Sequence, residues 1–187
     1  MIPIDITKAN IIEAREYHIK CLTPKILEEV SKSTNQKIKS FLTEDNIKSI
    51  LGNFPGELLQ LNLSFLQAVI ENFKIEDWEA YNHNRITKTR GFSQEENRLK
   101  NIFDNVYNEI EKIFSYKNFT TKKKKEYDAY DLAENLDIPT CPYCNRMYTK
   151  TVKGKAGKKI IRPEFDHWFP KSEYPLLALS FYNLIPS

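Results

Sequence analysis

The strongest periodic pattern in the chain lies between residues 93 and 114. Ser93 and Glu96 form a capping-box pattern, in which each side chain accepts a hydrogen bond from a backbone N–H at the start of a helix. Apolar residues then recur at steps of three and four: Leu99, Ile102, Phe103, Val106, Tyr107, Ile110, Ile113 and Phe114. These steps place the apolar side chains on one face, so the pattern predicts an amphipathic helix.

Weaker patterns predict helices through the rest of residues 1–135. We expect one helix over residues 7–21 and a second over residues 24–40, which begins at Pro24. Thr43 is a typical N-cap and Gly52 a typical stop for a third helix. The residues after Pro55 predict a nearly all-apolar, buried helix. The sequence YDAYDLAENLDI (127–138) predicts a short helix that ends before Pro139.

The pattern changes after Cys141. The sequences RMYTKTV (146–152) and KKIIRPEF (158–165) are rich in β-branched or alternating residues, and Gly154 and Gly157 lie between them as turn residues. This indicates a β-hairpin. The predicted fold class is therefore α+β, with a mainly helical N-terminal domain over residues 1–137 and a small second domain over residues 138–187.

Composition and charge narrow the function classes. Apolar residues make up 41% of the 187 residues and charged residues 28%, which is an ordinary globular balance. No apolar run is long enough to span a membrane and the N-terminus lacks signal-peptide character, so we expect a cytoplasmic protein. Residues 141–187 hold eight Lys or Arg against three acids, whereas the other 140 residues hold 20 basic and 22 acidic groups. A basic segment attracts polyanions.

Lysines between the two predicted strands are candidate nucleic-acid contacts: Lys153, Lys155, Lys158 and Lys159. The alternative is that they form an ordinary solvated loop. Lys171 lies further along the chain, where it can contact phosphate or cap a loop.

Cys141 and Cys144 enclose the sequence CPYC, which allows two interpretations. A redox dithiol needs a helix that begins at the first cysteine and lowers the thiol pKa, but here Pro139 precedes the pair and a strand-like run follows it. Half of a four-ligand zinc site needs only a tight turn with a hairpin behind it, which fits better. His18 and His83 show no ligand spacing, so the remaining zinc ligands are not evident.

The sequence PEFDHWFPKSEYPLLALSFYNLIPS completes an ordered set of motifs: Cys-x-x-Cys, Asp166-His167, Pro170-Lys171 and Asn183-Leu-x-Pro. Over residues 138–187 this set resembles the HNH endonuclease family. The resemblance implies a ββα-metal fold, whose second Cys-x-x-Cys and final helix are expected after Ser187. The helical part resembles extensions of HNH nucleases from bacterial defence loci.

The resemblance also implies site roles. His167 corresponds to the general base, Asp166 to a ligand of catalytic Mg²⁺ or Mn²⁺, and Asn183 to a residue that holds the loop and orients the histidine. Cys141 and Cys144 correspond to ligands of a structural Zn²⁺. Adjacent strand residues point to opposite faces, so Asp166 and His167 can share a site only where their strand ends or bends. The sequence Trp168-Phe169-Pro170 marks such an ending.

These features together predict a metal-dependent endonuclease that hydrolyses phosphodiester bonds in DNA. The defence-locus resemblance further implies a role against phage and an ATPase partner encoded alongside, although no residue demonstrates that partner. The alternative is a zinc-structured module that binds nucleic acid or a partner protein without catalysis.

Overall fold

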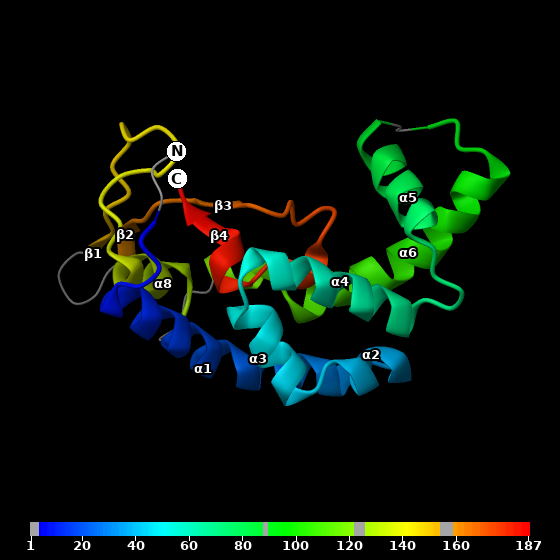
Figure 1. The fold of residues 1–187 in the computed structure, drawn as a ribbon, viewed down its shortest axis with the longest axis horizontal. Coiled ribbons are helices and arrows are strands. Elements are labelled where there is room, and N and C mark those ends of the chain that lie inside the picture. The colour runs from blue at the N-terminus through cyan, green and yellow to red at the C-terminus, as the bar shows by residue number, and fades with distance from the viewer. Residues whose placement is uncertain (1–3, 88–89, 122–125, 154–158) are drawn as a thin grey trace.

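The computed structural model describes residues 4–87, 90–121, 126–153 and 159–187. The chain is mostly helical, with short antiparallel strands confined to its C-terminal part, as expected for an α+β protein (Figure 1). Within the described residues, no helix combines the length and apolar character that a membrane crossing requires.

Four helices form the first part: α1 (Ala9–Lys32), α2 (Gln36–Phe41), α3 (Glu44–Gly52) and α4 (Pro55–Val69). Thr43 caps α3 by accepting from the Asn46 N–H, α3 ends at Gly52, and Pro55 opens α4, all as predicted. The prediction of a break before Pro24 was wrong, because Pro24 lies inside α1. Burial on both sides of the proline, at Leu22 and at Ile26, favours a continuous helix over the local cost of the missing N–H.

Four more helices follow: α5 (Ile75–Thr87), α6 (Gln94–Ile113), α7 (Tyr116–Thr121) and α8 (Ala129–Leu136). The predicted capping box of α6 is present, since Ser93 accepts from the Glu96 N–H and Glu96 accepts from the Ser93 N–H. The apolar face of α6 is buried, and α6 packs against α5. The predicted short helix appears as α8, capped by Asp128.

The strands differ from the sequence prediction. Two short antiparallel strand pairs form: β1 (Val152–Lys153) pairs with β2 (Lys159–Ile161), and β3 (Phe165–His167) pairs with β4 (Leu184–Pro186). The predicted strand over residues 146–152 is mostly irregular, with one isolated bridge between Thr140 and Tyr148. The predicted strand over residues 158–165 is divided at Pro163, which lacks the N–H that a continuous ladder needs.

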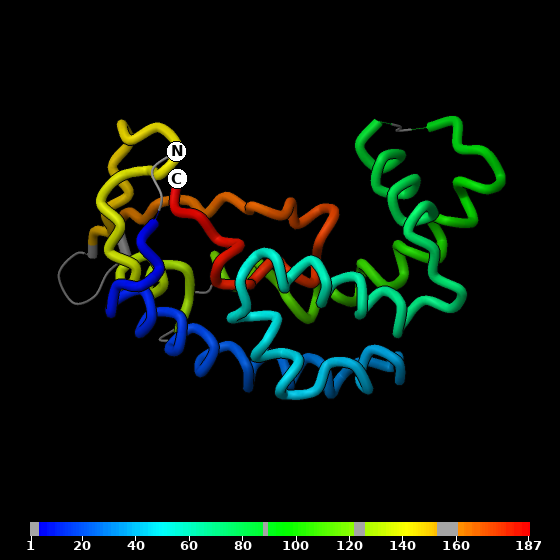
Figure 2. Tube along the Cα trace, viewed as in Figure 1, coloured from blue at the N-terminus to red at the C-terminus, as the bar shows by residue number. Residues whose placement is uncertain are grey.

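One hydrophobic core extends across the predicted boundary at residues 137 and 138. Phe165, Leu177 and Leu184 belong to the same buried cluster as Ile26 and Phe103. Figure 2 shows the chain after β2 running out along the helices and returning as β4. The return passes through two short 3₁₀ turns, η2 (Pro175–Leu177) and η3 (Phe181–Asn183), which contact α3; η2 also contacts α4 and α6. The C-terminal segment is therefore embedded among the helices.

His18 joins three distant parts of this core. Its side chain is fully buried in α1, where Nδ1 lies 2.9 Å from the Tyr127 hydroxyl and Nε2 lies 2.7 Å from the Leu179 carbonyl oxygen. A carbonyl only accepts, so Nε2 carries the proton and Nδ1 accepts from Tyr127. Burial lowers the pKa of His18 to about 4, although the bond to Leu179 opposes this. The histidine is thus neutral in the folded chain.

We predict that His18 makes the fold sensitive to acid. The unfolded chain has a histidine pKa of about 6.5, so between pH 6.5 and 4 it binds more protons than the folded chain. The contribution of His18 to the unfolding free energy is therefore complete above pH 6.5 and falls by about 3 kcal/mol as the pH approaches 4. Denaturant unfolding at a series of pH values should show this fall in the wild type and a flatter profile in His18→Gln.

The exposed His83 on α5 supplies the matched control. His83→Gln should keep the wild-type profile, because its side chain is not buried by folding. An identical pH dependence in wild type and His18→Gln would contradict the assignment of this sensitivity to His18.

Candidate functional site

Pairing of β3 with β4 brings two of the sequence motifs side by side. Asp166 lies opposite Ile185, and His167 lies opposite Leu184, the residue after Asn183. Strand β3 ends at His167, as the sequence predicted. Two motifs separated by sixteen residues therefore meet at one place, where the strand pairing stops.

The imidazole of His167 is half-buried and has a defined orientation. Its Nε2 donates to the Ala178 carbonyl oxygen at 3.1 Å, which leaves Nδ1 unprotonated and without a hydrogen-bond partner among the described residues. Burial lowers the pKa of His167; the bond to Ala178 and the nearby Asp166 oppose this shift, and Lys171 adds to it. The arrangement thus favours a neutral ring with an available lone pair on Nδ1.

Asp166, the residue before His167, carries an exposed carboxylate. Its Oδ1 accepts from the backbone N–H of His167 at 2.9 Å, which fixes the carboxylate at the end of the strand. Tyr143, from the Cys-x-x-Cys turn, lies next to it. Burial raises the pKa of Tyr143, and the charge of Asp166 and a hydrogen bond to its carboxylate raise it further. The cysteine turn and the Asp166-His167 pair are therefore neighbours.

Asn183 is fully buried and holds the loop between β3 and β4. Its Oδ1 accepts from the Phe169 N–H at 2.6 Å, and its Nδ2 donates to the carbonyl oxygens of Phe169 at 3.2 Å and Leu177 at 2.7 Å. Leu177 directly precedes Ala178, whose carbonyl oxygen accepts the hydrogen bond from His167 Nε2. The side-chain amide of Asn183 thus helps to position the imidazole of His167, because it holds the backbone of the loop that carries Ala178.

Tyr116, at the start of α7, is a site residue that the sequence did not reveal. Its hydroxyl donates to the Phe165 carbonyl oxygen at 3.1 Å, and its ring meets the His167 ring edge-on with centroids 4.6 Å apart. The Lys171 ammonium lies 4.4 Å from the centre of the same ring. One aromatic side chain from the helical part therefore packs against both the histidine and the nearest lysine. The local sequence carries no signal for this role.

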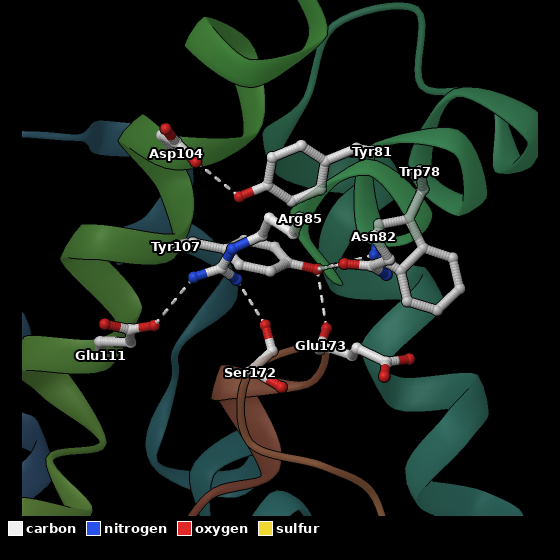
Figure 3. Close-up of polar contacts among 9 residues, drawn as sticks. All are labelled: Trp78, Tyr81, Asn82, Arg85, Asp104, Tyr107, Glu111, Ser172 and Glu173. Atoms are coloured by element: carbon white, nitrogen blue, oxygen red, sulfur yellow. Dashed lines mark hydrogen bonds and ion pairs between the residues drawn. The ribbon is translucent and has the colours of Figure 1, made fainter. Parts of the chain in front are cut away.

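Helices α5 and α6 hold the turn that follows β3 (Figure 3). The Tyr107 hydroxyl donates to the Glu173 carbonyl oxygen at 2.7 Å and accepts from the Trp78 indole N–H at 2.7 Å. Arg85 donates to the Ser172 carbonyl oxygen and lies over the Tyr107 ring. Both carbonyls belong to the residues directly after Lys171. The two helices therefore hold the backbone next to this lysine in place.

Cys141 and Cys144 lie in a single turn, and no helix begins at Cys141. The Asn145 N–H donates to the Cys141 carbonyl oxygen at 2.8 Å, and Asn145 takes the left-handed conformation with φ of 52°. Backbone N–H groups of Arg146 and Met147 donate to the Cys144 sulfur and lower the pKa of its thiol. The turn is thus suited to hold a thiolate, as a metal ligand requires.

The predicted lysine contacts are only partly within the structure. Lys155 and Lys158 lie outside the described residues. The backbones of Lys153 and Lys159 are opposite each other in the β1–β2 hairpin. Lys171 is exposed at the turn after β3.

The metal ligands implied by the sequence form two separate groups: the thiols of Cys141 and Cys144, and the carboxylate of Asp166. The described residues contain no group of three or more His, Cys, Asp or Glu side chains that could enclose a metal ion. A thiol pair and an exposed carboxylate fit the zinc and magnesium chemistries respectively, each as part of a ligand set.

We predict that Asn183→Ala will destabilise the fold by about 2 kcal/mol, because it removes the side-chain partner of the Phe169 N–H and carbonyl and one of the two donors to the buried Leu177 carbonyl. Denaturant unfolding measures this loss. Asn62→Ala is the matched control: Asn62 is also buried, but its Nδ2 has no hydrogen-bond partner among the described residues. Similar losses for the two variants would show that the Asn183 bonds carry no special weight.

Comparison of the chain with protein-family models, with curated proteins and with solved structures found no match.

Proposed function

We propose that this chain is an HNH-type, metal-dependent endonuclease that hydrolyses phosphodiester bonds in DNA. One observation carries the proposal: the Nε2–H of His167 is bonded to the Ala178 carbonyl, which leaves the lone pair of Nδ1 free, and the preceding residue, Asp166, carries an exposed carboxylate at the end of β3. A neutral imidazole with one nitrogen held and the other free is the form that a general base requires.

The role of His167 follows from this geometry. A water molecule near Nδ1 can lose its proton to the ring as it attacks the phosphorus. The carbonyl of Ala178 then stabilises the resulting imidazolium, because it already accepts from Nε2. The lowered pKa keeps the ring unprotonated near neutral pH, so the base is available without a preceding proton loss.

Asp166 is the residue that would hold a catalytic Mg²⁺ or Mn²⁺. Its carboxylate is exposed, anchored by the His167 N–H, and offers hard oxygen ligands of the kind these ions prefer. When bound there, such an ion supplies positive charge that offsets the charge developing on the phosphate and on the leaving oxygen. Asn183 has no free polar group for a ligand role, so we assign it to positioning.

The other parts of the proposal concern structure and partners. Cys141 and Cys144 supply two ligands of a structural Zn²⁺, which would hold the cysteine turn beside Asp166. The positive balance of residues 141–187 suits a DNA backbone, and the lysines of the β1–β2 hairpin are its expected contacts. A place in anti-phage defence, with an ATPase partner, follows from the family resemblance.

The proposal predicts the behaviour of His167→Ala in a plasmid-nicking assay. The complete encoded protein is incubated with Mg²⁺ or Mn²⁺, with and without any partner encoded alongside. The variant should lose about 10²–10⁴-fold in rate while its DNA affinity and fold stay nearly unchanged, because a general base acts in the transition state. Asp166→Ala should also be inactive, and raised Mn²⁺ should restore part of its activity.

The same assay separates the nuclease from a non-catalytic binding module. The matched control is Trp168→Ala, which removes an exposed neighbouring side chain and should keep most activity. DNA binding without metal-dependent nicking by the wild type would favour the binding module. Nicking by His167→Ala at the wild-type rate would contradict the assignment of His167 as the general base.

The zinc assignment has its own prediction. Metal analysis of the complete encoded protein should find about one zinc per chain, and Cys144→Ser should lose most of it, because four-ligand zinc sites tolerate few ligand losses. Cys21→Ser is the control, since Cys21 lies in α1. A zinc-free, folded protein whose Cys141 and Cys144 readily form a disulfide would support the redox interpretation instead.

A further inference from the structure

A cavity of about 490 Å³ opens between α7 and the turn after β3. Arg85 of α5, Glu111 of α6, Lys117 of α7, and Lys171 with Ser172 of the turn contribute to its wall. Its volume falls in the range of sites that hold small ligands or parts of larger ones. The wall combines helical residues with residues of the candidate site.

The charge of this cavity is positive. Its described wall carries three cationic side chains and one carboxylate. Arg85 and Glu111 form an ion pair at 3.7 Å, which offsets the carboxylate. Neither Lys117 nor Lys171 has an ion-pair partner within the parts of the chain that the structure describes. Two uncompensated ammonium groups in a concave wall attract anions more strongly than they would on a flat surface.

The cavity adjoins His167 on one side of its ring. Ala178, whose carbonyl accepts from Nε2, lines the cavity, as does Tyr116, whose ring packs against the imidazole. His167 itself is not among the residues that line the cavity. An anion in the cavity would therefore be a neighbour of the reacting group rather than the group itself.

The cavity wall is preset by contacts within the protein. Arg85 and Tyr107 hold the carbonyls of Ser172 and Glu173, and Tyr116 supports the ammonium of Lys171 (Figure 3 shows the first two). Because Lys171 is already positioned, it loses less conformational entropy when an anion binds.

We infer that this cavity binds a phosphate of the nucleic-acid strand that flanks the scissile bond, with Lys117 and Lys171 as its contacts. The inference rests on the proposed function, because it takes His167 as the group beside the bond that is cut. In this arrangement α7 helps to hold the substrate strand, although none of the sequence motifs lies in α7.

The test measures binding without cleavage. A fluorescent single-stranded DNA of about 20 nucleotides is titrated with the complete encoded protein without added Mg²⁺ or Mn²⁺ and without chelator, at several salt concentrations, and followed by anisotropy. Lys117→Gln with Lys171→Gln should weaken binding about tenfold. The slope of log affinity against log salt should become shallower by about 0.7, the contribution of one neutralised phosphate on a single strand.

Two variants sharpen this test. Lys20→Gln with Lys37→Gln removes the same charge from exposed positions on α1 and α2 and should leave the slope unchanged. Lys117→Gln alone should give about half of the double variant's effect on the slope, and it leaves the contact between Lys171 and Tyr116 intact. Equal losses in the Lys20 and Lys117 pairs, or no loss in either, would overturn the inference.

A free nucleotide is the competing occupant, because it offers the same phosphate chemistry. AMP that binds the wild type but not Lys117→Gln, with strand affinity equal in both, would assign the cavity to a nucleotide and overturn the inference. Because the binding arm contains no added Mg²⁺ or Mn²⁺, it is independent of the nicking assay. Loss of strand affinity in the Lys117 pair, in a protein that never nicks, would refute the nuclease while keeping the phosphate site.

Discussion

The fold depends on satisfying the backbone of a buried segment that has little regular structure. Residues 175–181 are all buried, yet only short 3₁₀ turns run through them. Buried carbonyl groups without partners are costly. Backbone N–H groups of the turns satisfy the carbonyls of Pro175, Leu177, Ser180 and Phe181, and others depend on side-chain donors. Helical side chains supply them to this segment and its flanks: His18 to Leu179, Tyr107 to Glu173, Arg85 to Ser172 and Tyr116 to Phe165. Asn183, two residues after the segment, donates to Leu177 inside it and to Phe169 before it.

This constraint makes the helices part of the candidate site. The ring of His167 is placed by Ala178, by the loop that Asn183 holds, and by the Tyr116 side chain. The first two come from the motif segment and the third comes from α7. The nuclease proposal therefore concerns the whole chain, since the residues that shape the surroundings of His167 are spread from α5 to β4.

Local signals explain which elements the sequence predicted well. The capping box at Ser93 and the cap at Thr43 each involve residues three apart, so the sequence contains both partners. The break expected at Pro24 failed because burial along α1 outweighed the local cost of proline. The strand expected over residues 146–152 failed because strand propensity alone supplies no pairing partner.

The site was predictable to the extent that its motif is local. Asp166, His167 and Asn183 meet through one hairpin-like pairing of nearby segments. Tyr116, Arg85 and Lys117 reach the site from other elements; Tyr116 contacts Phe165 across 49 residues and Arg85 contacts Ser172 across 87. Periodicity and motif spacing do not encode contacts at such separations.

The contacts between helical side chains and loop carbonyls have a consequence for how this protein can change during evolution. When two side chains touch, a substitution in one can be compensated by a substitution in the other, and the pair then varies together among related sequences. The acceptors of His18 and Tyr107 are backbone oxygens at Leu179 and Glu173, which every amino acid provides. Changing the residue at the acceptor position cannot repair a lost donor. Each such donor residue would therefore be conserved by itself. Its contact with the loop backbone would not appear as a pair of positions that vary together among related sequences.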